Sequence, residues 1–190
     1  MRTTRVHFVV GALLAAACGG GSTTTADSGT PLPDSGSDAS AAATTVSGSA
    51  DGTPFTSATT SLWIGSPDAA DTTVVYVFSK PVACSELATQ GWDKRITDAT
   101  QFLEMKMFGT SPQTFKVTSS LTPAPGEASV NYTLSSKATT PSESSGTGGS
   151  VTLTEVVAKT HATGAFALDF GSNKLSGTYD AVYCPGGHEP

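Results

Sequence analysis

The sequence predicts an all-β domain after a disordered N-terminal tether. The expected fold is an antiparallel β-sandwich or barrel of roughly 8–10 strands with one short helical excursion. Apolar and polar residues alternate in several short segments beyond residue 45, as in strands with one solvated face. Two segments near the C-terminus share an order of glycine and aromatic residues that suits a hairpin. A single segment breaks this β pattern, so the helical content should be small.

Residues 1–17 have the composition of a secretory signal peptide. Arg2 and Arg5 precede an uncharged apolar run at residues 8–17 that ends in three alanines. A helix of these ten residues would cover only about half of a hydrocarbon core that is ~30 Å thick. We therefore expect a cleaved export signal and no membrane-spanning helix here.

Residues 14–18, LAAAC, resemble the lipobox of bacterial lipoproteins. In that family a signal peptidase cuts just before the cysteine, which then carries lipid. The resemblance implies that Cys18 is lipidated and anchors the protein to a membrane, and Gly19 after it implies the outer membrane. Ala15 stands at the usual leucine position, with Leu14 before it. The alternative is an ordinary secretory cut at the same place, which would release a soluble periplasmic or secreted protein.

A disordered linker is expected at residues 18–45. Residues 19–50 are almost wholly Gly, Ser, Thr, Ala, Asp and Pro, and such a segment buries too little apolar surface to offset the entropy lost on ordering. Its acids lack the one-three-five spacing of a calcium loop, so we interpret Asp27, Asp34 and Asp38 as solvated charges. Residues 46–190 remain and should form a single β-domain.

The sequence has three cysteines. If Cys18 carries lipid, Cys84 and Cys184 remain as an even pair, and an oxidising compartment favours a disulfide between them. The alternative is two buried free thiols that act as small hydrophobic residues.

The strands are expected in a regular succession, beginning with two short ones joined by a tight turn at Asp51-Gly52. Residues 73–78, TVVYVF, are apolar on both sides, as in a central strand covered by a second layer. Residues 103–108 and 129–134 alternate instead, so each should have one wet face. Strands are predicted at 47–50, 54–56, 62–64, 73–78, 103–108, 113–118, 129–134, 151–157, 163–170 and 176–183.

The last two strands should pair as an antiparallel hairpin. Residues 163–170 and 176–183 each contain a glycine followed by aromatic residues two and six positions later, and the turn GSNK lies between them. An internal duplication is the alternative origin of this match. The expected cross-strand pairs are Phe166 with Tyr179, Phe170 with Leu175, and Gly177 with Leu168.

The segment that breaks the β pattern is residues 84–95, CSELATQGWDKR. It should make one or two helical turns that end at Gly91. A disulfide from Cys84 would tie it to the C-terminal edge of the sheet. Residues 141–149, PSESSGTGG, are expected to be a flexible loop between strands.

Few residues indicate chemistry. Beyond the signal, His161 and His188 are the histidines, and neither zinc-ligand spacing nor a G-x-S-x-G nucleophile motif is present. We therefore expect no cofactor, no metal site and no catalytic residue. The acidic residues of the strands are expected on solvated faces: Glu104, Glu155, Asp169 and Asp180.

Trp92 and His161 are the candidates for contact with a ligand. Trp92 would either stack against a sugar ring or pack as a lid on the sheet edge, whereas Trp63 is expected in the core. Loss of Arg2 and Arg5 with the signal leaves 8 basic against 16 acidic residues, a net charge of −8. Lys94-Arg95 is the only adjacent basic pair, which argues against nucleic acid as a partner. The sequence does not indicate whether the partner is a protein or a glycan.

These observations predict a non-enzymatic lipoprotein of the cell envelope, which displays a tethered, disulfide-stapled β-domain with a structural or interaction role. The alternative is a secreted small-ligand or carbohydrate binder, or a hydrolase, with a site on the domain loops. Converging acids, a histidine and an open pocket would favour the alternative, whereas a filled interior would favour display, since fold alone does not define function.

Overall fold

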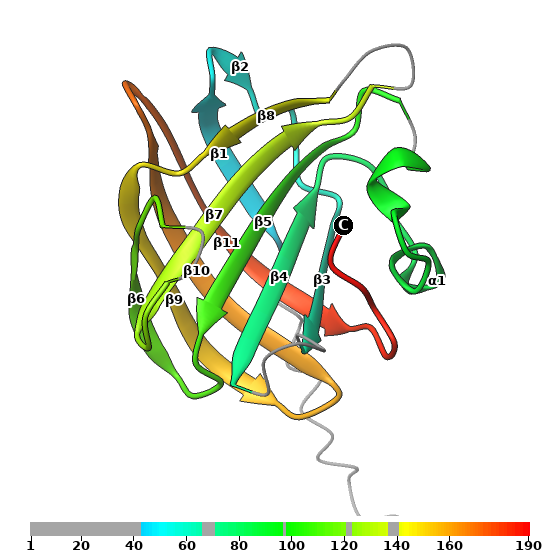
Figure 1. Cartoon of the computed structure of the whole chain (residues 1–190), viewed down its shortest axis with the longest axis vertical. Helices are drawn as coiled ribbons and strands as arrows, with labels where there is room; N and C mark the ends of the chain where they lie inside the picture. Colours follow the sequence, from blue (N-terminus) through cyan, green and yellow to red (C-terminus); the bar gives the residue numbers. More distant parts are fainter. Residues whose placement is uncertain (1–42, 66–70, 97, 121–122, 137–140) are drawn as a thin grey trace, which may run out of the picture. The chain divides into compact units, whose positions relative to one another are not determined.

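The computed structural model describes residues 43–65, 71–96, 98–120, 123–136 and 141–190. The predicted signal peptide, Cys18 and most of the predicted tether lie outside the described residues. Within the described ranges the chain is all-β, as predicted (Figure 1). It has eleven strands, against the roughly 8–10 expected, and two short helical turns. None of the helices in these ranges is long and apolar enough to cross a membrane.

The strands follow one another along the chain with few interruptions. They are β1 Thr45–Ala50, β2 Thr53–Pro54, β3 Thr60–Gly65, β4 Thr72–Phe78, β5 Gln101–Phe108, β6 Gln113–Val117, β7 Glu127–Leu134, β8 Ser142–Ser145, β9 Gly148–Val157, β10 His161–Phe170 and β11 Asn173–Tyr183. The helical turns are α1 Cys84–Leu87 and the 3-10 turn η1 Trp92–Lys94. Asp51 and Gly52 have positive φ angles and turn β1 into β2, which confirms the predicted tight turn.

The sheet closes on itself as a barrel. Its strand order is β10-β9-β6-β7-β5-β4-β3-β11, and β11 also pairs with β10. At two places in the barrel wall, one edge of a strand pairs with two different strands. The free side of β7 pairs with β8 and, in parallel, with β6, while β11 pairs with β1 over one half and with β3 over the other. Closure leaves few exposed strand edges, which are a common route to aggregation.

The prediction of a flexible loop at 141–149 was wrong. Within that segment β8 pairs with β7, for example Ser144 with Tyr132, and β9 already begins at Gly148. Serine-rich segments lack the apolar alternation that indicates a strand. The neighbouring edge of β7 nevertheless supplies backbone partners, so this strand is set by its tertiary context.

The pairing of the last two strands differs from the expected register by two residues. The turn between β10 and β11 has two residues rather than four, with Gly171 at φ 62°. Phe166 therefore lies opposite Gly177, and Gly164 lies opposite Tyr179. A Cβ on Gly177 would come 2.8 Å from the Phe166 ring, and one on Gly164 would come 2.4 Å from the Tyr179 hydroxyl. The first aromatic ring of each motif, Phe166 or Tyr179, thus lies against the glycine of the other strand.

Apolar side chains fill the barrel interior. They come from every strand of the wall and form one buried cluster that includes Trp63, Val75, Val77, Leu103, Met105, Met107, Phe115, Val130, Tyr132, Val151, Leu153, Phe166, Leu168, Phe170, Leu175 and Tyr179. Gln101 links β5 to β2 and β7, since its side-chain amide donates hydrogen bonds to the Pro54 carbonyl and the Tyr132 hydroxyl. Trp63 is 7% exposed, so its predicted core position is confirmed.

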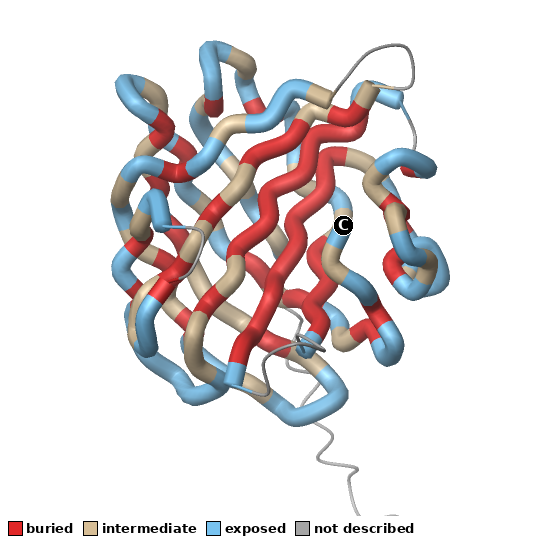
Figure 2. The backbone as a smooth tube through the Cα atoms, viewed as in Figure 1, coloured by how far each residue is buried: buried red, intermediate tan, exposed pale blue. Residues whose placement is uncertain are grey.

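A second layer covers the outside of the barrel at β3, β4 and β5. All seven residues of β4 are buried (Figure 2), which confirms the two-sided burial expected of TVVYVF. The inward residues of β4 join the interior cluster, while Val74, Tyr76 and Phe78 pack outward against Leu87, Trp92 and other buried residues of the excursion. The two helical turns lie within residues 84–95, as predicted. However, Gly91 at φ 65° starts the second turn, whereas it was expected to end the helix.

Candidate functional site

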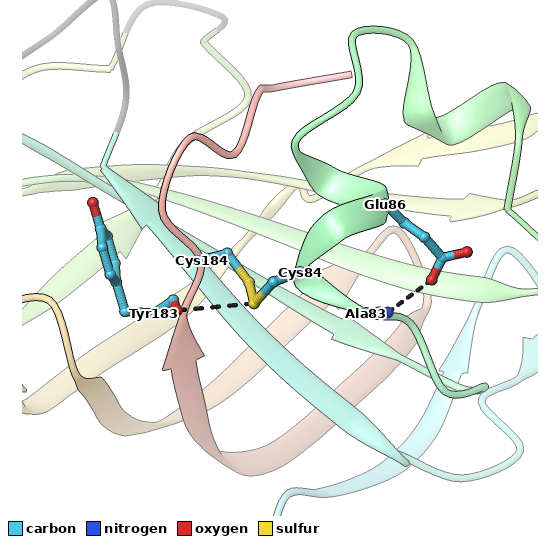
Figure 3. The surroundings of a disulfide bond; sticks show 5 residues. All are labelled: Ala83, Cys84, Glu86, Tyr183 and Cys184. Carbon is cyan, nitrogen blue, oxygen red and sulfur yellow. Dashed lines mark hydrogen bonds between the residues drawn. A yellow bond between two sulfur atoms is a disulfide. The ribbon is translucent and has the colours of Figure 1, made fainter.

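Cys84 and Cys184 form a disulfide, as predicted (Figure 3). Cys84 is the first residue of α1, and Cys184 directly follows β11. Their Cα atoms lie 5.1 Å apart across 100 residues of sequence. The bond therefore joins the start of the helical excursion to the beginning of the C-terminal tail, residues 184–190.

The C-terminal tail lies against the same outer layer, beside β3 and the excursion (Figure 1). The His188 amide donates a 2.9 Å hydrogen bond to the Leu87 carbonyl, and the Trp92 indole N–H donates to the His188 carbonyl at 2.9 Å. The Lys106 ammonium forms a 2.6 Å ion pair with the Glu189 carboxylate. Two hydrogen bonds thus join the tail to the excursion, and the ion pair joins the tail to β5.

Trp92, one of the two ligand candidates, is fully buried. Its ring centroid lies 5.2 Å from those of Tyr76 and Phe102 and 5.8 Å from that of Phe78. Of the two interpretations of Trp92, the structure agrees with the lid that packs on the sheet. Its ring offers no exposed surface on which a sugar could stack.

His161, the other ligand candidate, lies on the outer surface at the start of β10. Its side chain is 35% exposed, and its Nε2 lies 3.7 Å from a Glu155 carboxylate oxygen. Val157 and Val182 are its cross-strand neighbours and are both exposed. His161 and Trp92 therefore belong to different surroundings, and the structure does not unite them in one site.

Glu104 is only 9% exposed, so the prediction that it lies on a solvated face was wrong. It lies on the outer face of β5 between Tyr76 of β4 and Asn131 of β7, under the second layer that the sequence pattern did not place. Burial, aided by the Glu189 carboxylate, raises the pKa of Glu104 from 4.5 to about 7, although the Lys106 ammonium opposes this shift. Burial and the Glu104 charge also raise the pKa of Tyr76.

The raised pKa of Glu104 makes stability depend on pH. Between about pH 4.5 and 7 the folded chain holds a proton on Glu104 that the unfolded chain has released, so the free energy of unfolding should fall as the pH rises. The loss from this group is roughly 3 kcal/mol and ends near pH 7, where both states are ionised. Urea unfolding at several pH values measures it.

Glu104→Gln imitates the protonated acid and should remove this part of the pH dependence. Glu155→Gln is the matched control, because the Glu155 side chain is 60% exposed and should leave the profile unchanged. A Glu104→Gln chain with the same pH profile as the original chain would show that Glu104 is not the responsible group.

An open cavity of about 370 Å³ lies at the mouth of the barrel, where β3, β4, β9 and β11 come together. Its lining residues are Trp63, Gly65, Thr72, Thr73, Thr110, Val156, Ala158, Lys159 and Tyr183. The ring centroids of Trp63 and Tyr183 lie 4.8 Å apart. We call this cavity the mouth cavity. Apart from Trp63, expected in the core, sequence analysis singled out none of these residues, because the closure of the barrel brings them together from distant segments.

Two of the lining residues each carry a polar atom that is buried away from solvent and has no hydrogen-bond partner among the described residues. These atoms are the indole nitrogen of Trp63 and the hydroxyl oxygen of Thr72. Lys159 is the only charged side chain among the described lining residues; it is exposed and lies in the turn between β9 and β10 at φ 57°. Elsewhere within the described ranges, no three or more His, Cys, Asp or Glu residues are grouped so that they could hold a metal ion.

Comparison of the chain with protein-family models, with curated proteins and with solved structures finds no match.

Proposed function

We propose that this chain is an exported lipoprotein of the cell envelope, anchored through Cys18, which displays a disulfide-stapled β-barrel on a flexible tether. The observation that carries this proposal is the pairing of Cys84 with Cys184. It uses two of the three cysteines and leaves Cys18, the cysteine of the lipobox-like segment, for lipid. A structural disulfide also favours an oxidising compartment outside the cytoplasm.

The interior of the barrel supports a role in display or interaction rather than transport of a ligand inside the barrel. Barrels that carry small molecules keep a central space. Here aromatic and aliphatic side chains, among them Phe115, Tyr132 and Phe166, fill the interior cluster. The structural or interaction role therefore belongs to the outer surface and the barrel mouth, and we propose no enzymatic activity.

The lipid anchor is tested by metabolic labelling of cells with a fatty acid. The full-length chain should incorporate the label, and Cys18→Ser should abolish it, because the cysteine sulfur is the attachment point in lipoproteins. The matched control is the double variant Cys84→Ser with Cys184→Ser, which should still be labelled. Label on a Cys18→Ser chain, or its continued recovery with membranes, would contradict the anchor.

The proposed location is the outer membrane, as the residue after Cys18 is Gly19. Fractionation of cells should recover the labelled chain with outer membranes. Recovery with inner membranes would contradict this location while leaving the lipid anchor intact.

The mouth cavity favours a second candidate function, that of a small-ligand or carbohydrate binder. A concave site with two aromatic side chains and a few polar groups has the character of a small-molecule site, and barrel mouths are a frequent location for such sites. This function is compatible with display, since a tethered domain can present a binding site.

A further inference from the structure

We propose that the mouth cavity binds a small ring compound that bears a carboxylate, with the ring against Trp63 and Tyr183 and the carboxylate at Lys159. This inference rests on the second candidate function proposed above, a small-ligand site at the mouth cavity, and does not depend on the lipid-anchored display. Aromatic side chains, a cation and open space meet in this one place.

The aromatic pair provides an apolar wall. Trp63 and Tyr183 come from the neighbouring strands β3 and β11, where they are paired in register. Their ring planes are inclined by 53°. Tyr183 is partly exposed, so part of this wall is open to solvent. Aromatic faces of this kind bind the flat, apolar face of a ring.

Lys159 gives the site its charge preference. It has no ion-pair partner among the described residues, as is also true of Lys94 and Lys116. No acidic side chain is among the described residues that line the cavity. Since the chain as a whole is acidic, a cavity whose described lining has a lysine as its one charged residue favours an anionic ligand.

The size of the cavity limits the ligand to about one ring. Its volume of about 370 Å³ lies near the lower end of the range for small-molecule sites. Sugar acids and aromatic acids share the required chemistry, a ring of this size with a carboxylate.

Calorimetric titration of the full-length chain with glucuronate and with benzoate tests the proposal, with glucose and benzyl alcohol as the neutral counterparts. At least one carboxylate should bind, and more tightly than its neutral counterpart. Preference for glucuronate would identify a sugar acid as the source, and preference for benzoate an aromatic acid. Absence of binding by both carboxylates at millimolar concentration, or equal binding of acid and neutral counterpart, would overturn the proposal.

Two variants locate the site. Lys159→Gln should weaken binding at least about tenfold, because it removes a charge-assisted hydrogen bond. Lys116→Gln is the matched control, since Lys116 is exposed on β6 and is not among the lining residues, and it should bind as the original chain does. Unchanged affinity of Lys159→Gln would refute the assignment of the carboxylate to Lys159.

Gly65→Val should block the cavity without disturbing the sheet. Gly65 lines the cavity, and a Cβ added to it meets no atom within 4 Å, so the new side chain has open space to occupy. Loss of binding with an unchanged urea unfolding midpoint supports the location. Full binding by Gly65→Val would place the ligand elsewhere and overturn the proposal. Lys159→Gln keeps the test decisive if Gly65→Val alters the fold.

Discussion

Removal of the Cys84–Cys184 disulfide is expected to lower the free energy of unfolding by about 4 kcal/mol. The bond closes a loop with a sequence separation of 100 residues, and for a loop of this size the chain-entropy model gives up to about 4.7 kcal/mol. The bond also fixes α1 and the C-terminal tail to each other. The double variant Cys84→Ala with Cys184→Ala, unfolded in urea, measures the effect.

The original chain unfolded in the presence of a reductant serves as the control and should match the double variant. Agreement between the two would assign the loss to the bond rather than to the substituted side chains. A loss below about 1 kcal/mol in both would mean that the disulfide contributes little, and that tail and excursion are held by packing alone.

Replacement of Trp92 by alanine should cost about 3–5 kcal/mol, the usual range for removal of a fully buried large aromatic side chain. Trp92 is 0% exposed and contacts the rings of Tyr76, Phe78 and Phe102. Its loss would open a cavity between the excursion and the outer face of the sheet. Urea unfolding of Trp92→Ala gives the free energy.

Trp92→Phe is the matched variant that separates packing from hydrogen bonding. It keeps an aromatic ring but removes the indole N–H that donates to the His188 carbonyl, which typically costs about 1 kcal/mol. We therefore expect a much smaller loss for Trp92→Phe than for Trp92→Ala. Equal and small losses in both variants would show that the second layer does not depend on Trp92.

Local sequence determined which segments became strands. Strict alternation in residues 103–108 predicted a strand, and two-sided apolarity in TVVYVF predicted a strand that is buried on both faces, since side chains point to alternate faces of a sheet. Asp51-Gly52 determined a tight turn through its two positive φ angles. The number of cysteines, with Cys18 assigned to lipid by the lipobox resemblance, led to the bond between Cys84 and Cys184.

The register of the last hairpin depended on the length of its turn. The glycine and aromatic motifs of β10 and β11 were visible in the sequence, but their pairing required the turn length, and Gly171 allowed a two-residue turn. With that turn Phe166 faces Gly177 and Tyr179 faces Gly164. A change in turn length shifts every cross-strand pair of a hairpin.

The sequence by itself determined an all-β chain with a stapled excursion, because strand periodicity, turn residues and cysteine number are local properties. Only the tertiary structure decided that Glu104 is buried, that Trp92 is a lid, and that Trp63, Lys159 and Tyr183 share a cavity. The physical reason is that each of these depends on which distant segment covers or approaches the residue. The sequence around Glu104 alternates as an exposed strand would, and only the tail and excursion above it remove it from water.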